Sequence, residues 1–352
     1  MQPIPMVRAN AILPFVAFLE HVGAPADRVF AAVGLSPRLV SEPETLLPLH
    51  KALKFLEAAA RSEGLETLGL AVGLRAPFET LGRFARVVRG VPTLQSALSR
   101  LIGAIALHNS GDRLWLTVHH DHAFLCHAYG LSDSSGQRQG EQFAFAMMMA
   151  AVRGVLGAPD WRPDKIRLPA WEAGSRQAIE AMLQAPVTCT GMITMIVFPT
   201  DLLAAPSCAA VRGLGPLGDD DRLLRSTAPA ADFAGSIRQT IGVLLLGGPP
   251  SIRDTAEAVG VSARTLQRRL AACGETYSGL VDTVRLETGA RLLCDTDAKL
   301  LEIAYELGYT DPANFTRAFK RWAGVAPRAY RRAQSASIAG CSDREHAPPI
   351  SP

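Results

Sequence analysis

Four side chains that can hydrogen-bond to a base pair stand close together in the chain, namely Arg264, Thr265, Gln267 and Arg268. Leu266 and Leu270 are four residues apart, so they occupy one face of a helix and leave the polar side chains on the other. Arg can donate two parallel hydrogen bonds to guanine, and Gln can pair in the same way with adenine. The spacing therefore predicts a helix whose exposed face reads base edges in the major groove of DNA.

A second group of outward-facing positions follows further along the chain, at Pro312, Ala313, Thr316, Arg317 and Lys320. Phe315 and Phe319 supply the buried face of this second helix. The first two members of the group cannot donate side-chain hydrogen bonds, so this helix should depend on Arg317, on Thr316 and on apolar contact with thymine methyl groups. We therefore expect the second helix to discriminate less between DNA sequences than the first.

Both helices belong to one pattern that the chain contains twice, in residues 251–274 and 299–324. Each copy has an alanine, a glycine four residues later and a hydroxyl residue two positions after the glycine. The alanine allows close helix crossing, the glycine permits a tight turn, and Ser262 and Asp311 can cap the helices that follow. The pattern predicts two helix-turn-helix units joined by a linking helix at 277–294. A purely structural role is the alternative, but it leaves the outward Arg and Gln side chains unexplained.

Residues 251–332 resemble the DNA-binding domain of the AraC/XylS family of bacterial transcription regulators. The resemblance rests on VSARTLQRRLAACGETYSGLVDTVRLETGARLL and on IAYELGYTDPANFTRAFKRWAGVAPRAYR, which closes with G-x-x-P-x-x-Y-R. It implies two sets of base-contacting positions. The first recognition helix contributes Arg264, Gln267 and Arg268. The second contributes Pro312, Ala313, Thr316 and Arg317.

The length of 352 residues predicts more than one domain. Residues 236–336 hold 14 Lys and Arg against 10 Asp and Glu, a local charge of +4, whereas the whole chain carries +3. The basic excess thus lies in the doubled pattern, as contact with phosphates requires. Composition and periodicity divide the chain into four segments. These are an effector-sensing and dimerisation domain at 1–205, a linker at 206–232, the DNA-binding domain at 233–333 and a disordered tail at 334–352.

Before the predicted linker, the hydrophobic period changes from that of helices to that of strands. Residues 1–75 have apolar positions at helical spacing, separated by turn signals. Leu114, Leu116 and Val118 then alternate with other residues, which predicts a β-hairpin with residues 123–129. A helix rich in Met and Ala follows. The expected fold is an α+β first domain, with helices and a small sheet, followed by an all-α domain with two helix-turn-helix motifs.

The predicted hairpin carries aromatic and polar side chains that can line an effector pocket, namely Trp115, Phe124, His127 and Tyr129. The same side chains can form ordinary core, and the run at 147–149 reads as helix core or as a partner face. FETLGRFARVVRGVPTLQSAL and WRPDKIRLP make this domain similar to the effector domain called arabinose-binding-like in one branch of the AraC/XylS family. That resemblance implies a small-molecule effector, without implying arabinose.

Several classes of protein are disfavoured by what the chain lacks. Four histidines of the hairpin, at positions 119, 120, 122 and 127, do not have the spacing of a known metal-ligand set, so we expect a solvated turn and no metal. The absence of Walker, GxSxG and HExxH motifs argues against an enzyme, and no cofactor is expected. Scattered cysteines are typical of reduced thiols. No apolar segment is long enough to span a bilayer, so we expect a cytoplasmic protein without a membrane partner.

These observations predict a sequence-specific transcription regulator, and an activator in particular. We expect a homodimer that binds double-stranded promoter or operator DNA and contacts RNA polymerase. A small-molecule effector would act by favouring one arrangement of the first domain. The alternative is a DNA-binding regulator without an effector, in which the first domain serves only dimerisation or contact with a protein partner.

Overall fold

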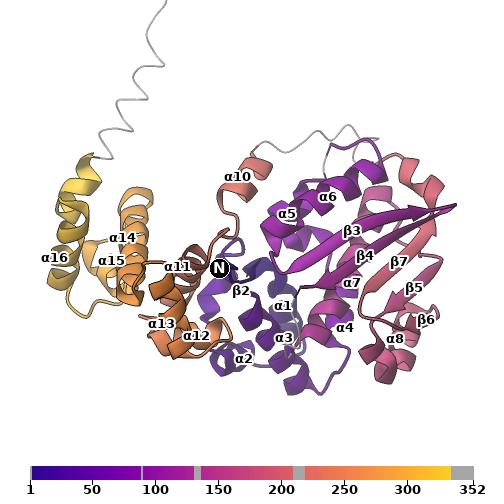
Figure 1. Cartoon of the computed structure of the whole chain (residues 1–352), viewed down its shortest axis with the longest axis horizontal. Coiled ribbons are helices and arrows are strands. Elements are labelled where there is room, and N and C mark those ends of the chain that lie inside the picture. Colours follow the sequence, from indigo (N-terminus) through magenta and orange to yellow (C-terminus); the bar gives the residue numbers. More distant parts are fainter. Residues whose placement is uncertain (1, 89, 131–135, 209–218, 334–352) are drawn as a thin grey trace, which may run out of the picture. The chain divides into compact units, whose positions relative to one another are not determined.

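The computed structural model describes residues 2–88, 90–130, 136–208 and 219–333. It contains two compact units, and the chain passes from the first to the second between Ser236 and Ile237. The first unit combines helices with two small sheets, and the second is helical (Figure 1). The expected fold class, an α+β domain followed by an all-α domain, is confirmed.

The helices that the periodicity of residues 1–75 predicts lie in the first unit. Its α-helices are α1 (Leu13–His21), α2 (Ala26–Val33), α3 (Leu49–Glu63), α4 (Leu68–Arg75), α5 (Arg83–Arg86), α6 (Leu94–His108), α7 (Gln137–Leu156), α8 (Arg176–Leu183) and α10 (Asp220–Ser226). Its strands are β1 (Met6–Arg8), β2 (Leu46–Pro48), β3 (Asp112–His119), β4 (His122–Tyr129), β5 (Lys165–Leu168), β6 (Val187–Cys189) and β7 (Thr194–Pro199). Gly34 and Gly64 end α2 and α3 in the left-handed conformation that glycine adopts without strain.

The larger sheet has the strand order β3-β4-β7-β5-β6, and its pairs are antiparallel except β5 with β6. β3 and β4 form the predicted hairpin, with Leu114 opposite His127 and Trp115 opposite Cys126. Successive residues of a strand point to opposite faces, whereas directly paired residues share a face. One face of the hairpin therefore carries Leu114 and His127, and the other carries Trp115 and Cys126.

α7 packs closely against α4 because α4 has glycines where the two helices meet. A Cβ atom at Gly69 would collide with the carbonyl oxygen of Gln139, and one at Gly73 would collide with Ala146. The Gln139 side chain accepts a hydrogen bond of 2.8 Å from the Gly69 N–H, which has no capping side chain in its own helix. These contacts orient α7 so that the methionines at 147–149 are buried. Their burial agrees with the interpretation of this run as helix core.

Part of the segment predicted as a linker is folded onto the first unit. α10 lies within the range 206–232 and contacts α5 and α6. Leu224 of α10 is fully buried, and the buried Arg8 guanidinium donates to the Leu224 and Thr227 carbonyls at 3.0 and 3.1 Å. Residues 209–218 of the predicted linker, and the tail predicted at 334–352, lie outside the described residues. Residues 219–232 belong to the first unit, because buried polar and apolar contacts hold α10 there.

The second unit contains the two predicted helix-turn-helix motifs. Its helices are α11 (Phe233–Leu245), α12 (Ile252–Ala258), α13 (Ala263–Ala272), α14 (Tyr277–Asp295), α15 (Leu300–Glu306) and α16 (Pro312–Ala323). Gly260 and Gly308 have φ angles of 73° and 79° in the turns between α12 and α13 and between α15 and α16. Ser262 and Asp311 accept backbone N–H hydrogen bonds at the starts of α13 and α16, as the capping pattern predicts.

α14 is the predicted linking helix, and it contacts both motifs. The Tyr277 hydroxyl at its start lies 2.8 Å from the Thr255 hydroxyl of α12. Further along, a Cβ atom at Gly289 would lie 3.1 Å from Leu307 and 3.5 Å from Phe315, so the glycine allows the second motif to pack closely. α14 thereby connects the two motifs through packed contacts as well as through the chain.

Candidate nucleic-acid interface and internal cavity

The outer face of α13 holds the first set of predicted base-contacting residues. Those with exposed side chains are Arg264, Gln267 and Arg268. Leu266 and Leu270 are buried on the opposite face, which fixes the orientation of the helix within its motif. Thr265 is half-buried, and its hydroxyl lies 2.9 Å from the capping hydroxyl of Ser262. α13 therefore presents three side chains with free hydrogen-bonding groups and a fourth that is already engaged at the cap.

Among the predicted residues, α16 presents fewer exposed hydrogen-bonding side chains than α13. Its exposed predicted residues are Ala313, Arg317 and Lys320. Pro312 and Thr316 are half-buried, and the Thr316 hydroxyl donates to the Pro312 carbonyl at 2.9 Å. That hydroxyl hydrogen is already used inside the helix, so Arg317 and Lys320 are the predicted members that present charged donors to solvent.

Asn314 is an exposed polar residue of α16 that the sequence reasoning missed. Its Oδ1 atom accepts a hydrogen bond from the Arg317 guanidinium. Asn can pair with adenine through two hydrogen bonds, and its position next to the buried Phe315 could have indicated an outward side chain. The structure thus places an amide beside the one exposed arginine among the predicted contacts of this helix.

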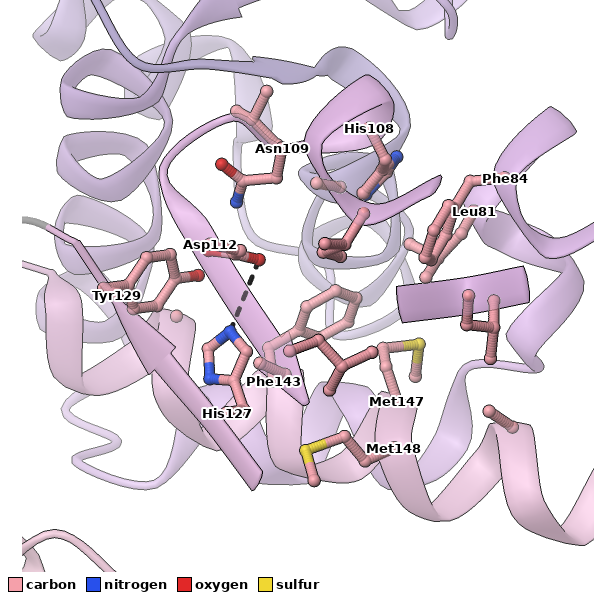
Figure 2. A pocket seen from close by; sticks show the side chains of 18 of the residues that line it. Leu81, Phe84, His108, Asn109, Asp112, His127, Tyr129, Phe143, Met147 and Met148 are labelled. Carbon is pink, nitrogen blue, oxygen red and sulfur yellow. Dashed lines mark ion pairs between the residues drawn. The ribbon is translucent and has the colours of Figure 1, made fainter. Parts of the chain in front are cut away.

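A cavity of about 90 Å³ lies in the first unit, between one face of the hairpin and the surrounding helices. Much of its wall is apolar, with Leu81, Phe84, Phe143, Met147 and Met148 among the lining residues (Figure 2). Its polar lining residues are His108, Asn109, Asp112, His127 and Tyr129. Figure 2 shows the last four of these gathered at one end. An apolar cavity with a few convergent polar groups is the usual form of a small-molecule site.

The polar end of the cavity is organised by a buried charged cluster. His127 Nε2 lies 3.4 Å from Asp112 Oδ2, and His127 Nδ1 lies 3.0 Å from Glu141 Oε2. Glu141 also accepts hydrogen bonds from the Thr194 hydroxyl at 2.9 Å and from the Tyr129 N–H at 3.3 Å. Asp112 Oδ1 is buried and has no hydrogen-bond partner among the residues that the structure describes. Glu141 is therefore satisfied, whereas Asp112 keeps an acceptor for a molecule in the cavity.

Burial and nearby charged groups determine the charges of the two buried histidines. Burial alone lowers the pKa of an imidazole, but the carboxylates of Asp112 and Glu141 outweigh it and raise the pKa of His127 to about 10. Burial raises the pKa of Asp112, although the charge of His127 and hydrogen bonds from His127 and Asn109 act in the opposite direction. Burial, together with the nearby positive charge of Arg8, lowers the pKa of His108 to about 3. At neutral pH His127 is consequently an imidazolium, and His108 is neutral.

The four residues predicted to line an effector pocket lie on both faces of the hairpin. His127 and Tyr129 line the cavity. Trp115 and Phe124 point to the other face of the sheet and do not line it, because side chains alternate along a strand. A pocket on one face of the sheet cannot take both Phe124 and His127 from the same strand, so His127 and Tyr129 are the members of this group that line the cavity.

Asp112 and Glu141 are site residues that the sequence reasoning missed. Asp112 begins the hairpin, and Glu141 is an acidic residue within a helix rich in Met and Ala, which is a detectable signal. His119 and His120 lie at the far end of the hairpin and are exposed. Within the described residues, no group of three or more His, Cys, Asp or Glu side chains is arranged to hold a metal ion. No helix of the described chain is long and apolar enough to cross a membrane.

Comparison with known protein families decides the identity of the two units. Residues 23–207 match the family described as the arabinose-binding domain of AraC transcription regulator, N-terminal part. Residues 255–333 match a family of helix-turn-helix domains. The chain belongs to the AraC family of transcription regulators. Members of this family are DNA-binding regulators and not enzymes, which agrees with the absence of catalytic motifs in the sequence.

Individual AraC-type regulators resemble the chain over different lengths. The regulator VirS of Mycobacterium tuberculosis is 24% identical over 335 residues, which are 93% of this chain and 96% of VirS. The ornithine utilization regulator of Pseudomonas aeruginosa is 40% identical over 93 residues, which are 26% of this chain and 27% of that regulator. The transcriptional activator NphR of a Rhodococcus species is 32% identical over 82 residues, 23% of this chain and 24% of NphR. The higher identities are thus confined to about a quarter of each relative.

Proposed function

We propose that the chain is a cytoplasmic transcription activator controlled by a small-molecule effector that binds in the cavity of its first unit. The observation that carries the proposal is the cavity itself, with its apolar wall and the unpartnered Asp112 Oδ1 atom. A buried carboxylate oxygen without a partner destabilises the folded protein, and a bound ligand would supply the missing hydrogen bond. The match of residues 23–207 to an arabinose-binding domain family supports a ligand-binding role, and the printed name of NphR supports activation.

DNA recognition is assigned to α13 and α16. On α13, Arg264, Gln267 and Arg268 read base edges, with Thr265 at the margin of the contact. On α16 the contact involves Pro312, Ala313, Thr316, Arg317 and Lys320. We expect the two helices to read DNA unequally, because the predicted contacts include three exposed hydrogen-bonding side chains on α13 and two, Arg317 and Lys320, on α16. The second half-site is accordingly read with less discrimination.

Regulation follows from linkage between the two units. An effector shifts the protein towards one arrangement only if it binds that arrangement more tightly. In the proposed homodimer, the favoured arrangement changes how the paired second units engage operator half-sites and RNA polymerase. A coupling free energy of about 1–3 kcal/mol is typical for such control.

Mapping the promoter DNA that the full chain protects, with and without candidate effectors, tests this function directly. We expect two protected half-sites with unequal tolerance of base changes, and a protection pattern that changes when effector is added. A thermal-shift screen of the full chain identifies such effectors, because a ligand that binds only the folded state raises the melting temperature. Protection that no cavity ligand alters would favour a regulator whose first unit serves only dimerisation or a protein partner.

A further inference from the structure

The cavity separates a charged end from an apolar end, and this division restricts what can bind. The cluster places two carboxyl groups, those of Asp112 and Glu141, against the single imidazole of His127. Among the described residues that line the cavity, there is no Lys or Arg. A buried charge without a counter-charge is unfavourable, so the cluster favours a cation and opposes an anion.

We propose that the effector is a small monoamine with an apolar body, whose ammonium group donates to Asp112 Oδ1. This inference rests on the proposed function, since it names the ligand class of the same cavity. The ammonium places a positive charge beside the two carboxyl groups and donates to Asp112 Oδ1, the oxygen that has no hydrogen-bond partner among the described residues. Charge-assisted hydrogen bonds of this kind are roughly twice as strong as neutral ones.

The rest of the cavity excludes larger and more polar molecules of the same class. Opposite the charged end, the wall is formed by side chains such as Leu81, Phe84 and Met147, which cannot pair with a carboxylate. His108 is neutral there, so it offers no counter-charge to the carboxylate of an amino acid. A volume of 90 Å³ holds about six to nine water-sized atoms, at roughly 10–15 Å³ for each. An alkylamine or an aromatic monoamine of that size fits this description.

Three probes with the same carbon chain and different head groups test the proposal on the full chain. Calorimetric titration with hexylamine, hexanol and hexanoate compares a cation, a neutral donor and an anion. We expect hexylamine to bind about tenfold more tightly than hexanol, because the charge-assisted bond is worth about 1.4 kcal/mol more. Hexanoate should bind most weakly. Binding of hexanoate as tight as that of hexylamine, or no binding of hexylamine, would overturn the amine assignment.

Variants locate the effect at Asp112 and in the cavity. Asp112→Asn keeps the shape and removes the charge, so the preference for hexylamine over hexanol should disappear, whereas the exposed Asp201→Asn should retain it. Ala144→Leu fills the cavity and should abolish binding of all three probes, whereas Ala150→Leu, on the same helix outside the cavity lining, should not. Retained preference in Asp112→Asn would contradict the proposal. If that variant fails to fold, the relative affinities of the three probes for the unmodified chain still test the amine assignment.

DNA protection by the same preparation separates the two proposals. If hexanoate binds tightly and alters promoter protection, the cavity is an effector site and only the ligand class is wrong. If cavity ligands bind and protection never changes, the effector control itself fails.

A different set of contacts links the cavity wall to α10, the last helix of the first unit before α11. Val7 lines the cavity, and the next residue, Arg8, holds α10 through two carbonyls. Phe84 lines the cavity and stacks on His108 with 4.8 Å between ring centroids. In the same helix as Phe84, Arg86 binds Asp220 of α10 at 2.8 and 2.9 Å. Each anchor of α10 thus lies within two residues of a cavity-wall residue in the chain.

We infer from this arrangement that filling the cavity stabilises the docking of α10. A filled cavity immobilises Val7 and Phe84, and their neighbours then hold α10 for a larger fraction of the time. Because α10 precedes the second unit in the chain, its docking restricts the segment that leads to the DNA-binding helices. Any molecule or side chain that fills the cavity should stabilise the docking of α10 in this way.

Hydrogen exchange of the backbone amides at 223–227 in the full chain tests this coupling without a ligand. Ala144→Leu fills the cavity from α7, so exchange at α10 should slow by at least about fivefold, the lower end of typical coupling. Ala150→Leu should leave the rates unchanged. If Ala144→Leu fails to fold, Val7→Ala enlarges the cavity and should speed the exchange. Unchanged rates in the folded cavity variant, or equal slowing in Ala150→Leu, would refute the coupling.

Discussion

Arg86 and Asp220 form a two-point ion pair in which both carboxylate oxygens face the guanidinium, at 2.8 and 2.9 Å. The hydrogen bond to Asp220 raises the pKa of Arg86, so the guanidinium stays charged. Both side chains are more than half covered, with exposures of 32% and 17%. Two hydrogen bonds between the same two side chains, together with partial burial, distinguish this contact from the exposed ion pairs of α10.

Arg86→Ala should release α10 from the first unit. Loss of a two-point charged hydrogen bond at a partly buried site costs about 1–2 kcal/mol of local stability. Hydrogen exchange at 220–227 measures it. The control is Arg225→Ala on the same helix, because the exposed pair between Arg225 and Asp221 should contribute less than about 0.5 kcal/mol. Equal effects of the two substitutions would mean that the Arg86 pair does not hold the helix.

Arg268→Ala and Arg317→Ala should each weaken binding to the specific operator by about 1–3 kcal/mol, with little loss on random DNA. Both arginines are exposed on the outer faces of the predicted recognition helices. Titration of the full chain on both kinds of DNA at one fixed salt concentration gives the difference. Arg291→Ala, on α14, serves as the control. An equal loss on operator and random DNA would show that these residues contact phosphates.

Asp311→Ala should loosen the second recognition helix. Asp311 accepts a 2.8 Å hydrogen bond from the Ala313 N–H at the start of α16, and removal of such a cap costs about 0.5–2 kcal/mol. Asp311→Asn keeps an acceptor and should recover most of the stability. Amide exchange in α16, compared between the two variants, checks the prediction. Equal destabilisation by Ala and Asn would assign the effect to the charge of Asp311 instead of its cap.

Local patterns were sufficient to predict the second unit. Gly260 and Gly308 need left-handed turns, and apolar residues four apart define the buried faces of the recognition helices. These signals lie within a few residues of each other, so one sequence contains them completely. The hairpin was predictable for the same reason, since strand alternation is local.

The cavity and the docking of α10 depend on contacts between distant residues. Asp112 and Glu141 share His127 across β3, β4 and α7, and no local period indicates that these three meet. The aromatic ring of Trp115 favours a pocket lining in the sequence alone, but the face of a strand that meets the helices depends on tertiary packing. The polar composition at 219–232 resembled a linker because the anchors of α10, such as Arg8, lie far away in the sequence.

His127 should make the stability of the first unit fall as the pH rises above neutrality. Its pKa is about 10 in the folded protein, where Asp112 and Glu141 favour the imidazolium, against 6.5 for an ordinary histidine. Between these values the folded state holds a proton that the unfolded chain has lost. The contribution is therefore complete below pH 6.5 and disappears as the pH approaches 10.

His127→Gln should destabilise the unit strongly at about pH 6 and much less at about pH 10, because only the protonated imidazole is stabilised by the carboxylates. Urea unfolding of the unmodified chain, His127→Gln and the exposed His21→Gln, each at both pH values, measures the difference. A loss of stability in His127→Gln that is the same at both pH values would mean that packing of the ring, and not its charge, is what the first unit requires.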